Sequence, residues 1–446
     1  MKNVVRFFSV LLIAAFLQGC STFDGFFSES SLPPLKGERI PVLQSISDVT
    51  ADPALKDQPI ILPQAWTNEV WPQTGGYPNH AMGHLTLGKK LKKDWSVLVG
   101  ARGYRHNPLI VQPVVANGMV FTMDAWARVT AFDTKEGKRK WRAITKPEKE
   151  GEAKDPANFG GGIAFSVNKL FVTNGYKELL CLDPDDGKII WRIDVPSITR
   201  SSPTVADGKV YVITLDNRLM VYSTQDGSAL WNYSGISETT NVLGTVSPAV
   251  EGSLVVLPLS TGELVGLRAE NGQVVWSDNL SAVRRSGILA QIGNIRGQPV
   301  IDQGVVYASS YSGRMVALDA VTGQRLWQRE IGSAETPWSA GETVFVLSND
   351  QRLMALDRKT GGIRWITELP SHVVRKNNIP IVWTGPVLAG GRLILTSSRE
   401  RLVEVDPMTG TLIDVTGLGQ NVMVSPVVAN NTLYLLTEFG DLRAYR

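Results

Sequence analysis

The chain has 446 residues, of which 43% are hydrophobic and 42 are glycine, and its formal net charge is +3. So small a positive charge gives no reason to expect a nucleic-acid partner. The composition is that of a compact globular protein with many turns. The two cysteines, Cys20 and Cys181, allow at most one disulfide bond, and none within the chain if Cys20 carries lipid.

The first 20 residues have the pattern of a secretory signal sequence. Basic residues precede an apolar run over residues 7–17, which is shorter than the ~20 residues that a membrane-spanning helix needs. The run ends in LQGC, which is similar to a bacterial lipobox and would make Cys20 the lipidated first residue of the mature protein. The alternative is an ordinary signal peptide with an incidental cysteine. By resemblance to Gram-negative sorting, Ser21 favours the outer membrane.

A polar, proline-containing segment over residues 21–65 predicts an extended tether. Residues 66–446 are expected to form the folded domain. The first part of this domain, NEVWPQTGGYPNHAMGHLTL from Asn68, is punctuated by glycine and proline. We expect it to lie against the rest of the domain as a loop, held there by Trp66 and Trp71.

One short pattern recurs through the rest of the chain. ALDAVTGQRLW (residues 317–327) and ALDRKTGGIRW (355–365) share a small residue, an aspartate, a Thr-Gly pair and a tryptophan four residues after the glycine. Six copies keep this tryptophan: Trp141, Trp191, Trp231, Trp276, Trp327 and Trp365. A seventh copy has Asp414 in its place. The aspartate and glycine predict a tight turn, and a tryptophan, which buries roughly 200 Å2, is able to join neighbouring repeats.

A second pattern precedes each copy, as in QPVVANGMVFTM from Gln112 and SPVVANNTLYLL from Ser425. Each repeat contains four short runs of Val, Leu, Ile and Tyr separated by turn residues, which predicts four antiparallel strands. Four strands every 40 to 50 residues predict the blade of a propeller. Eight occurrences of the second pattern therefore predict an all-β, eight-bladed β-propeller.

The last repeat stops after three strands, at DLRAYR, so its fourth strand must come from elsewhere. The segment KKLKKDWSVLVG from Lys89 has an apolar run with a tryptophan and no inner strands of its own. We therefore expect this N-terminal strand, with Trp95 as its docking residue, to complete the eighth blade and close the ring. Closure removes the exposed edge that the alternative, an open solenoid, would leave.

The pattern A-x-D-x-x-T-G-x-x-x-W resembles the tryptophan-docking repeat of PQQ-type (quinoprotein) β-propellers, and the resemblance covers residues ~90 to 446. That family contains enzymes that bind pyrroloquinoline quinone (PQQ) and non-enzymatic proteins that share only the fold. Within it, the chain is most similar to the BamB-like lipoproteins of the outer-membrane β-barrel assembly machinery. The repeat specifies the fold strongly and the function weakly.

Signals for catalysis are few. The repeated aspartates are assigned to turns, and Cys181 aligns with small core residues of other repeats. His80 and His84 are four residues apart, but Gly83 argues against the helix that would bring them to one metal ion. PQQ dehydrogenases of this fold typically carry an adjacent cysteine pair, which this chain lacks. We therefore predict no enzyme activity, no cofactor and no metal site.

Function is expected in the links between blades, because loops on a rigid scaffold usually carry the binding sites. The link SDNLSAVRRSGILAQIGNIRG contains Arg284, Arg285 and Ile288, a mixture of arginine and aliphatic residues that is typical of partner surfaces. Alternatively, these residues fill the central channel. In BamB-like proteins the partner surface includes a link that here reads DVPSITRSSP, so the resemblance implies Ile198 and Arg200 as contacts.

The resemblance also implies a location and partners. It implies a lipoprotein anchored in the outer membrane, facing the periplasm, that binds the periplasmic part of a BamA-like protein and assists the insertion of outer-membrane proteins without catalysing a reaction. Other assembly-machinery lipoproteins and unfolded outer-membrane proteins are the further partners. The alternatives are a PQQ-dependent dehydrogenase and a propeller that binds another ligand of the cell envelope.

Overall fold

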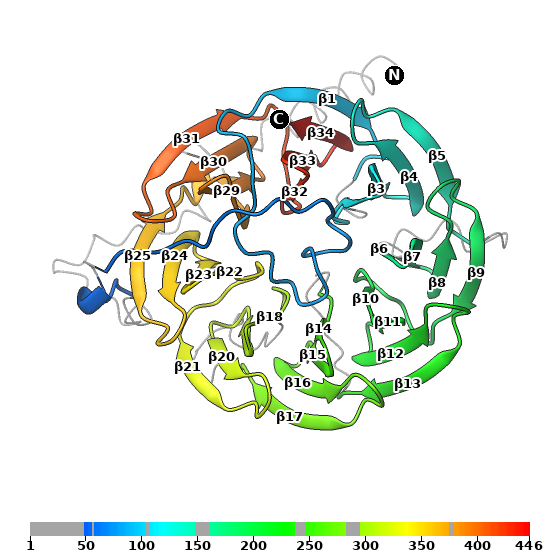
Figure 1. Cartoon of the computed structure of the whole chain (residues 1–446), viewed down its shortest axis with the longest axis horizontal. Coiled ribbons are helices and arrows are strands. Elements are labelled where there is room, and N and C mark those ends of the chain that lie inside the picture. The colour runs from blue at the N-terminus through cyan, green and yellow to red at the C-terminus, as the bar shows by residue number, and fades with distance from the viewer. Residues whose placement is uncertain are drawn as a thin grey trace, which may run out of the picture. The chain divides into compact units, whose positions relative to one another are not determined.

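The computed structural model describes residues 49–55, 58–103, 108–147, 160–236, 246–281, 295–373 and 379–446. These residues form eight four-stranded antiparallel sheets, arranged around a central axis like the blades of a propeller (Figure 1). The predicted all-β, eight-bladed β-propeller is confirmed. Four predicted site residues lie outside the described residues: Cys20, Arg284, Arg285 and Ile288.

Seven blades use consecutive strands, which run from the centre of the ring outward. Blade 1 contains β2 (Val114–Ala116), β3 (Met119–Met123), β4 (Arg128–Asp133) and β5 (Arg139–Ile144), and blade 2 contains β6 (Gly161–Ser166), β7 (Lys169–Asn174), β8 (Glu178–Leu182) and β9 (Ile189–Asp194). Blade 3 contains β10 (Thr204–Ala206), β11 (Lys209–Ile213), β12 (Arg218–Ser223) and β13 (Ala229–Ser234), and blade 4 contains β14 (Ala249–Glu251), β15 (Leu254–Pro258), β16 (Glu263–Arg268) and β17 (Val274–Asn279). Blade 5 contains β18 (Val300–Asp302), β19 (Val305–Ser309), β20 (Met315–Asp319) and β21 (Arg325–Arg329). Blade 6 contains β22 (Trp338–Ala340), β23 (Thr343–Leu347), β24 (Arg352–Asp357) and β25 (Ile363–Glu368), and blade 7 contains β28 (Trp383–Ala389), β29 (Arg392–Ser397), β30 (Arg401–Val405) and β31 (Leu412–Gly417). A small hairpin, β26 (His372–Val373) and β27 (Ile379–Pro380), lies in the link between blades 6 and 7.

The eighth blade combines strands from both ends of the domain. It contains β32 (Val427–Ala429), β33 (Thr432–Leu436), β34 (Asp441–Tyr445) and, outermost, β1 (Lys93–Leu98). β1 pairs antiparallel with β34, so that Trp95 lies opposite Ala444, and Lys92 and Arg446 exchange backbone hydrogen bonds of 2.8 and 3.0 Å. The predicted closure of the ring by an N-terminal strand is therefore confirmed.

The turn between the third and fourth strands of a blade explains the repeated Asp and Gly. In blade 5, Asp319 Oδ1 accepts hydrogen bonds from the backbone N–H groups of Val321 and Thr322, at 3.1 and 2.8 Å. Gly323 closes the turn with φ = +71°, in the left-handed region that glycine adopts without strain. The aspartates of these turns thus have the structural role that their spacing predicted.

The constant spacing of the tryptophan places it against the turn of the next blade. Six indole N–H groups each donate a hydrogen bond of 2.8–3.2 Å to a backbone carbonyl of the next blade. The acceptor is the residue that follows the turn aspartate or its equivalent, and the donors are Trp95, Trp141, Trp231, Trp276, Trp327 and Trp365. The exception is Trp191, whose Nε1 has no hydrogen-bond partner. The equivalent carbonyl in blade 3, that of Thr224, instead accepts Lys169 Nζ at 3.3 Å.

The glycine of each such turn lies directly beneath a tryptophan ring. A Cβ atom at Gly361 would lie 2.6 Å from Trp327, and at Gly272 it would lie 2.4 Å from Trp231. In most blades the indole also packs on an aromatic residue of the blade's own second strand, as Trp327 does on Tyr307 with ring centroids 6.0 Å apart. The glycine therefore serves two purposes, the turn conformation and the close approach of a neighbouring blade.

The missing tryptophan at Asp414 has a structural explanation. Position 414 lies on β31, where a tryptophan would dock onto the turn between the third and fourth strands of blade 8. That turn does not exist, because the third and fourth strands of blade 8, β34 and β1, are not consecutive in the chain. β31 is accordingly exposed along its whole length.

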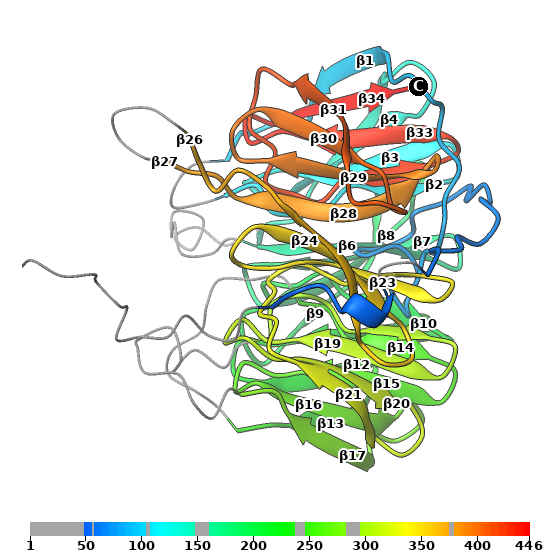
Figure 2. The same cartoon turned by 90° about the vertical axis from the view of Figure 1, so that its left-hand side faces the viewer.

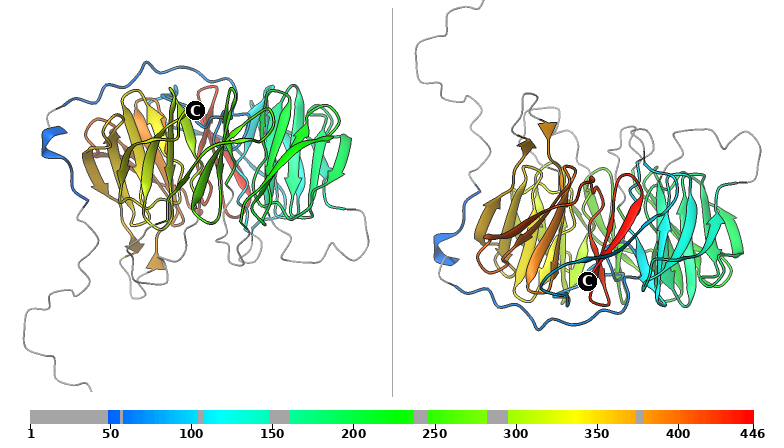
Figure 3. Two further views of the ribbon diagram at one scale, coloured as in Figure 1. Left: turned by 90° about the horizontal axis from the view of Figure 1, so that it is seen from below. Right: turned by 90° about the horizontal axis from the view of Figure 1, so that it is seen from above.

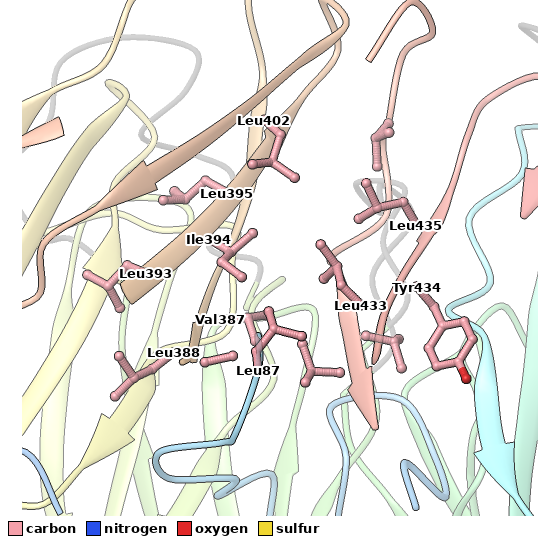
Figure 4. Packing of buried hydrophobic residues seen from close by; sticks show 14 of the residues in the cluster. Leu87, Val387, Leu388, Leu393, Ile394, Leu395, Leu402, Leu433, Tyr434 and Leu435 are labelled. Carbon is pink, nitrogen blue, oxygen red and sulfur yellow. The ribbon is translucent and has the colours of Figure 1, made fainter. Parts of the chain in front are cut away.

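The core consists of side chains between adjacent blades. Figure 4 shows part of it between blades 7 and 8, where Ile394 of β29 points toward Leu433 of β33. Their neighbours Leu393 and Tyr434 lie on the opposite faces of the same strands. Leu87, which precedes β1, belongs to the same cluster. The described residues contain no helix long and apolar enough to cross a lipid bilayer.

The compact unit begins at Val49, earlier than the boundary expected at residue 66. The chain from residue 49 includes the short 3-10 helix η1 (Pro53–Leu55) and packs on the outer strand of blade 6. Asp52 N–H donates to Ile363 O at 2.7 Å, and Ile60 is only 3% exposed. Backbone bonds to a strand edge and one buried aliphatic side chain hold these residues on the ring, although their composition is that of a tether.

Candidate functional site

The two faces of the ring carry different connections. The links between blades and the second turn of each blade lie on one face, here called the link face; the first and third turns lie on the other, the turn face. Figures 2 and 3 show the hairpin β26–β27 projecting from the link face, whereas the segment that precedes β1 runs along the turn face.

Residues 66–87, here called the plug, bind to the inner part of every blade (Figure 1). Trp71 and Val115 of blade 1 exchange backbone hydrogen bonds of 2.8 and 2.9 Å, and Leu85 N–H donates to Leu388 O of blade 7 at 3.1 Å. Each remaining blade has at least one bond: Asn68 Nδ2 to Val428 O, Phe165 N to Pro72 O, Val205 N to Gln73 Oε1, Val250 N to Pro78 O, Ile301 N to Asn79 O and Trp338 Nε1 to Gly83 O.

The plug closes one end of the central channel and leaves a cavity of about 350 Å3. Its floor is formed by four plug residues: Trp71, Thr74, Gly75 and His80. Its wall is formed mainly by link residues just before the inner strands of several blades, among them Ile110, Gln112, Arg200, Arg296, Gln298, Glu335, Thr336, Met423 and Ser425. The inner strands themselves add Trp338 of β22 and Thr384 and Val387 of β28. Because links lead into these positions, the wall residues lie toward the link face.

Gln112 joins the plug to two blades. Its Oε1 accepts the indole N–H of Trp71 at 3.2 Å and the backbone N–H of Gly75 at 2.8 Å, while its Nε2 donates to Ser425 O at 3.1 Å. A Cβ atom at Gly75 would lie 2.2 Å from Gln298 Oε1, and this glycine has φ = +80°. Glycine at this position therefore lets the floor approach the wall.

His80 is buried in the floor, with 3% of its surface exposed. Nδ1 lies 2.7 Å from the carbonyl oxygen of Pro299, and Nε2 has no hydrogen-bond partner. Burial lowers the pKa of His80 to about 4, so the ring is neutral at pH 7. Since a carbonyl only accepts, the proton belongs on Nδ1 and Nε2 is an unused acceptor.

Glu335 and Arg296 bring opposite charges into the wall. A Cβ atom at Gly297 would lie 2.3 Å from Glu335 O, so glycine there allows the two links to touch. Burial raises the pKa of Glu335. Two hydrogen bonds to its Oε2, from Gly385 N–H at 3.1 Å and from Ser425 Oγ at 3.2 Å, and the positive charge of Arg296 act in the opposite direction and lower this pKa, but burial has the larger effect. Arg296 Nε has no hydrogen-bond partner.

The two predicted contacts in DVPSITRSSP lie on one short link but in different surroundings. The link is fixed by Thr199, which is fully buried and donates from Oγ1 to Asn174 O at 3.1 Å. Ile198 is half-buried beside blade 3, where its carbonyl accepts Leu215 N–H at 2.8 Å. Arg200 lines the cavity, and burial lowers the pKa of its guanidinium from the ordinary value.

The histidines and the cysteine considered in the sequence have backbone or core roles. His84 Nδ1 lies 2.8 Å from Pro63 O, and its Nε2 accepts Gly391 N–H at 3.0 Å, so it does not share a ligand with His80. Cys181 is fully buried, which raises the pKa of its thiol to about 11. Among the described residues, no group of three or more His, Cys, Asp or Glu is placed to hold a metal ion.

The described lining of the cavity does not fit a quinone held by calcium. Such a site needs several hard oxygen ligands, carboxylates above all. Among the described residues that line the cavity, Glu335 is the single carboxylate, and two arginines, Arg200 and Arg296, line the same cavity.

Sequence reasoning does not identify most of the cavity. Arg296 belongs to the arginine-rich link, whereas no pattern marks His80 or Glu335 as a wall or floor residue. A usable signal is the polar residue before the proline of the second repeat pattern, as in Gln298-Pro299 and Ser425-Pro426. Since this position precedes the inner strand, it points to the channel in several repeats.

Tryptophan-docked blades, a ring closed by an N-terminal strand and a central channel define the class of PQQ-type β-propellers. A family model described as "Outer membrane protein assembly factor BamB" matches residues 127–367, more than half of the chain. The chain belongs to this family.

Individual relatives agree with the family. The outer membrane protein assembly factor BamB of Moranella endobia is 24% identical over 359 residues, which cover 80% of this chain and 90% of the relative. The crystal structure of BamB from Moraxella catarrhalis matches with a TM-score of 0.66 and 19% identity, covering 80% of this chain and all of that one. A quinohemoprotein alcohol dehydrogenase from Comamonas testosteroni matches almost as well, with a TM-score of 0.65, 14% identity and coverage of 85% and 81%. At these identities the structural matches show the fold alone.

Proposed function

We propose that this protein is a non-enzymatic scaffold of outer-membrane protein assembly, attached to the outer membrane through lipid on Cys20 and facing the periplasm. The main support is its membership of a family whose relatives are named outer membrane protein assembly factors and match over most of their length. Its partners are a BamA-like protein, other assembly-machinery lipoproteins and unfolded outer-membrane proteins.

The link that contains Ile198 and Arg200 is the proposed contact with the BamA-like protein. Thr199 and Ser201, which alternate with them, are buried and hydrogen-bonded, so the link is held on the scaffold in one conformation. A rigid loop with a half-buried aliphatic side chain loses little conformational freedom on binding. Arg284, Arg285 and Ile288 are the proposed second contact.

The test is affinity purification of the tagged protein from detergent-solubilised envelope. We expect a BamA-like protein in the eluate of the wild type and less of it with Ile198→Asp, Arg200→Glu or Arg285→Glu. Arg268→Glu is the matched control, because Arg268 is an exposed arginine at the end of β16, beside the third turn of blade 4. Absence of any such partner from the wild-type eluate would refute the scaffold role. Undiminished recovery with all three variants would place the interface elsewhere.

The competing enzyme function has its own test. We expect no change in the absorbance spectrum of PQQ when it is titrated with the protein in the presence of Ca2+, and no dye-linked oxidation of alcohols or sugars. Stoichiometric uptake of PQQ would replace the scaffold proposal by a quinoprotein enzyme.

A further inference from the structure

The cavity keeps two buried hydrogen-bond acceptors without partners. His80 Nε2 lies in the floor and Gln298 Oε1 in the wall, in residues that are 3% and 4% exposed. Unpaired buried polar atoms destabilise a fold, and most proteins avoid them. Both residues line the cavity, but the two atoms are themselves covered, so a ligand or water molecule that brings N–H or O–H groups into the cavity would satisfy them after a small rotation of each side chain.

The charge of the wall favours an anion. Arg200 and Arg296 line the cavity together with the single carboxylate of Glu335, so two positive charges face at most one negative charge among the described lining residues. Two hydrogen bonds already occupy Glu335 Oε2, whereas Nε of Arg296 is buried without a partner. A guanidinium group is suited to a carboxylate, which it binds with two parallel hydrogen bonds.

Part of the remaining lining is apolar and aromatic. Trp71 of the floor and Trp338 of blade 6 stack with ring centroids 6.4 Å apart, and both line the cavity. Val387 and Ile110 add aliphatic surface. The cavity thus combines an arginine pair, acceptors for N–H groups and an apolar wall in about 350 Å3, which suits a molecule of a few residues at most.

We propose that this cavity binds the terminal α-carboxylate of a peptide. The carboxylate would lie at Arg296 with Arg200 nearby, backbone N–H groups would donate to His80 Nε2 and Gln298 Oε1, and the terminal side chain would pack against Trp71 and Trp338. This chemistry is offered by a free dipeptide and by the C-terminus of a longer chain. The proposal goes beyond the scaffold role and does not depend on it, because the site needs no partner protein.

The experiment is isothermal titration of the mature full-length protein in detergent micelles at pH 7. The probes are the dipeptide alanyl-leucine, its C-terminal amide, and a ten-residue peptide that ends in the same two residues. We expect saturable binding of alanyl-leucine and at least about tenfold weaker binding of the amide, because the charged hydrogen bonds to Arg296 are lost. Binding of the ten-residue peptide as well would identify a chain terminus as the source, and its exclusion would identify the free dipeptide.

Variants assign the site. Arg296→Gln should weaken binding of alanyl-leucine about tenfold or more. Gln298→Met, which keeps the length of the side chain but removes the acceptor, should weaken it by a smaller factor. Arg268→Gln, the exposed control on β16, should leave it unchanged, and circular dichroism should show that all three variants are folded. No binding of any probe would mean that the cavity holds only water. That outcome, equal binding of acid and amide, or undiminished binding by both cavity variants would overturn the proposal.

Discussion

Replacement of Trp327 by alanine tests whether tryptophan docking holds the ring together. The indole is 7% exposed, donates to Arg358 O at 2.8 Å and lies against Gly361 of the next blade. Truncation of a buried tryptophan costs about 3–5 kcal/mol in the free energy of unfolding, because the neighbours collapse only partly into the space that it leaves. Here the space lies between two sheets whose backbones hold them apart, so we expect a value within that range.

The measurement is urea unfolding followed by far-ultraviolet circular dichroism, with the unfolding free energy taken from the midpoint and slope. Trp66→Ala is the control, because this indole of the plug is 39% exposed and can be replaced by water and a shifted loop; we expect a loss of roughly 1–2 kcal/mol. Trp327→Phe, which keeps a ring but lacks the N–H donor, should fall between the two. Equally small losses for both alanine variants would refute the docking argument.

Three further predictions concern a turn glycine, the lipid anchor and a buried histidine. Gly361→Ala should lower the unfolding free energy by about 1–3 kcal/mol, since the new Cβ would lie 2.6 Å from Trp327 at φ = +66°, whereas Gly304→Ala, with open space around it, should cost less in the same urea assay. Cys20→Ala should leave the protein unlipidated and outside the outer-membrane fraction; an unmodified mature N-terminus in wild-type mass spectra would contradict this. The pKa of His80 is about 4 in the folded protein and 6.5 ordinarily, so the contribution of neutral His80 to the free energy of unfolding is complete above pH 6.5. It is lost as the pH falls toward 4, by up to ~1.4 kcal/mol per pH unit. His80→Gln should flatten this pH dependence, and an unchanged slope would contradict the assignment.

The ring could be predicted from the sequence because its structure repeats with the sequence. Each blade contains the same alternation of strand and turn, so agreement between distant copies is enough to identify the turn Asp and Gly and the docking Trp327. Closure followed from a count of strands, which left Trp95 and the final three strands as complementary parts. Even the exception at Asp414 agrees with this logic, since the turn that a tryptophan would need is absent from blade 8.

The plug and the cavity could not be predicted in the same way. The plug has no repeating pattern, and most of its contacts with the blades use backbone atoms, as at Asn79 O and Ile301 N, which any residue type can supply. The cavity joins residues that are far apart in the chain, such as His80, Arg200 and Glu335. Their proximity depends on the number of blades and on where each link enters the channel, and neither a local pattern nor a spacing records it.

The plug also determines toward which face of the ring the cavity lies. Its bonds to every blade close the channel on the turn face, so the described lining residues, Arg296 and Glu335 among them, lie toward the link face. Ile198 lies on a link of that same face, one buried residue before Arg200. Arg200 therefore belongs to both proposed sites, and Arg200→Glu alone cannot distinguish loss of the partner protein from loss of a peptide. Ile198→Asp and Arg296→Gln separate the two, because the first side chain is absent from the cavity lining and the second lines the cavity.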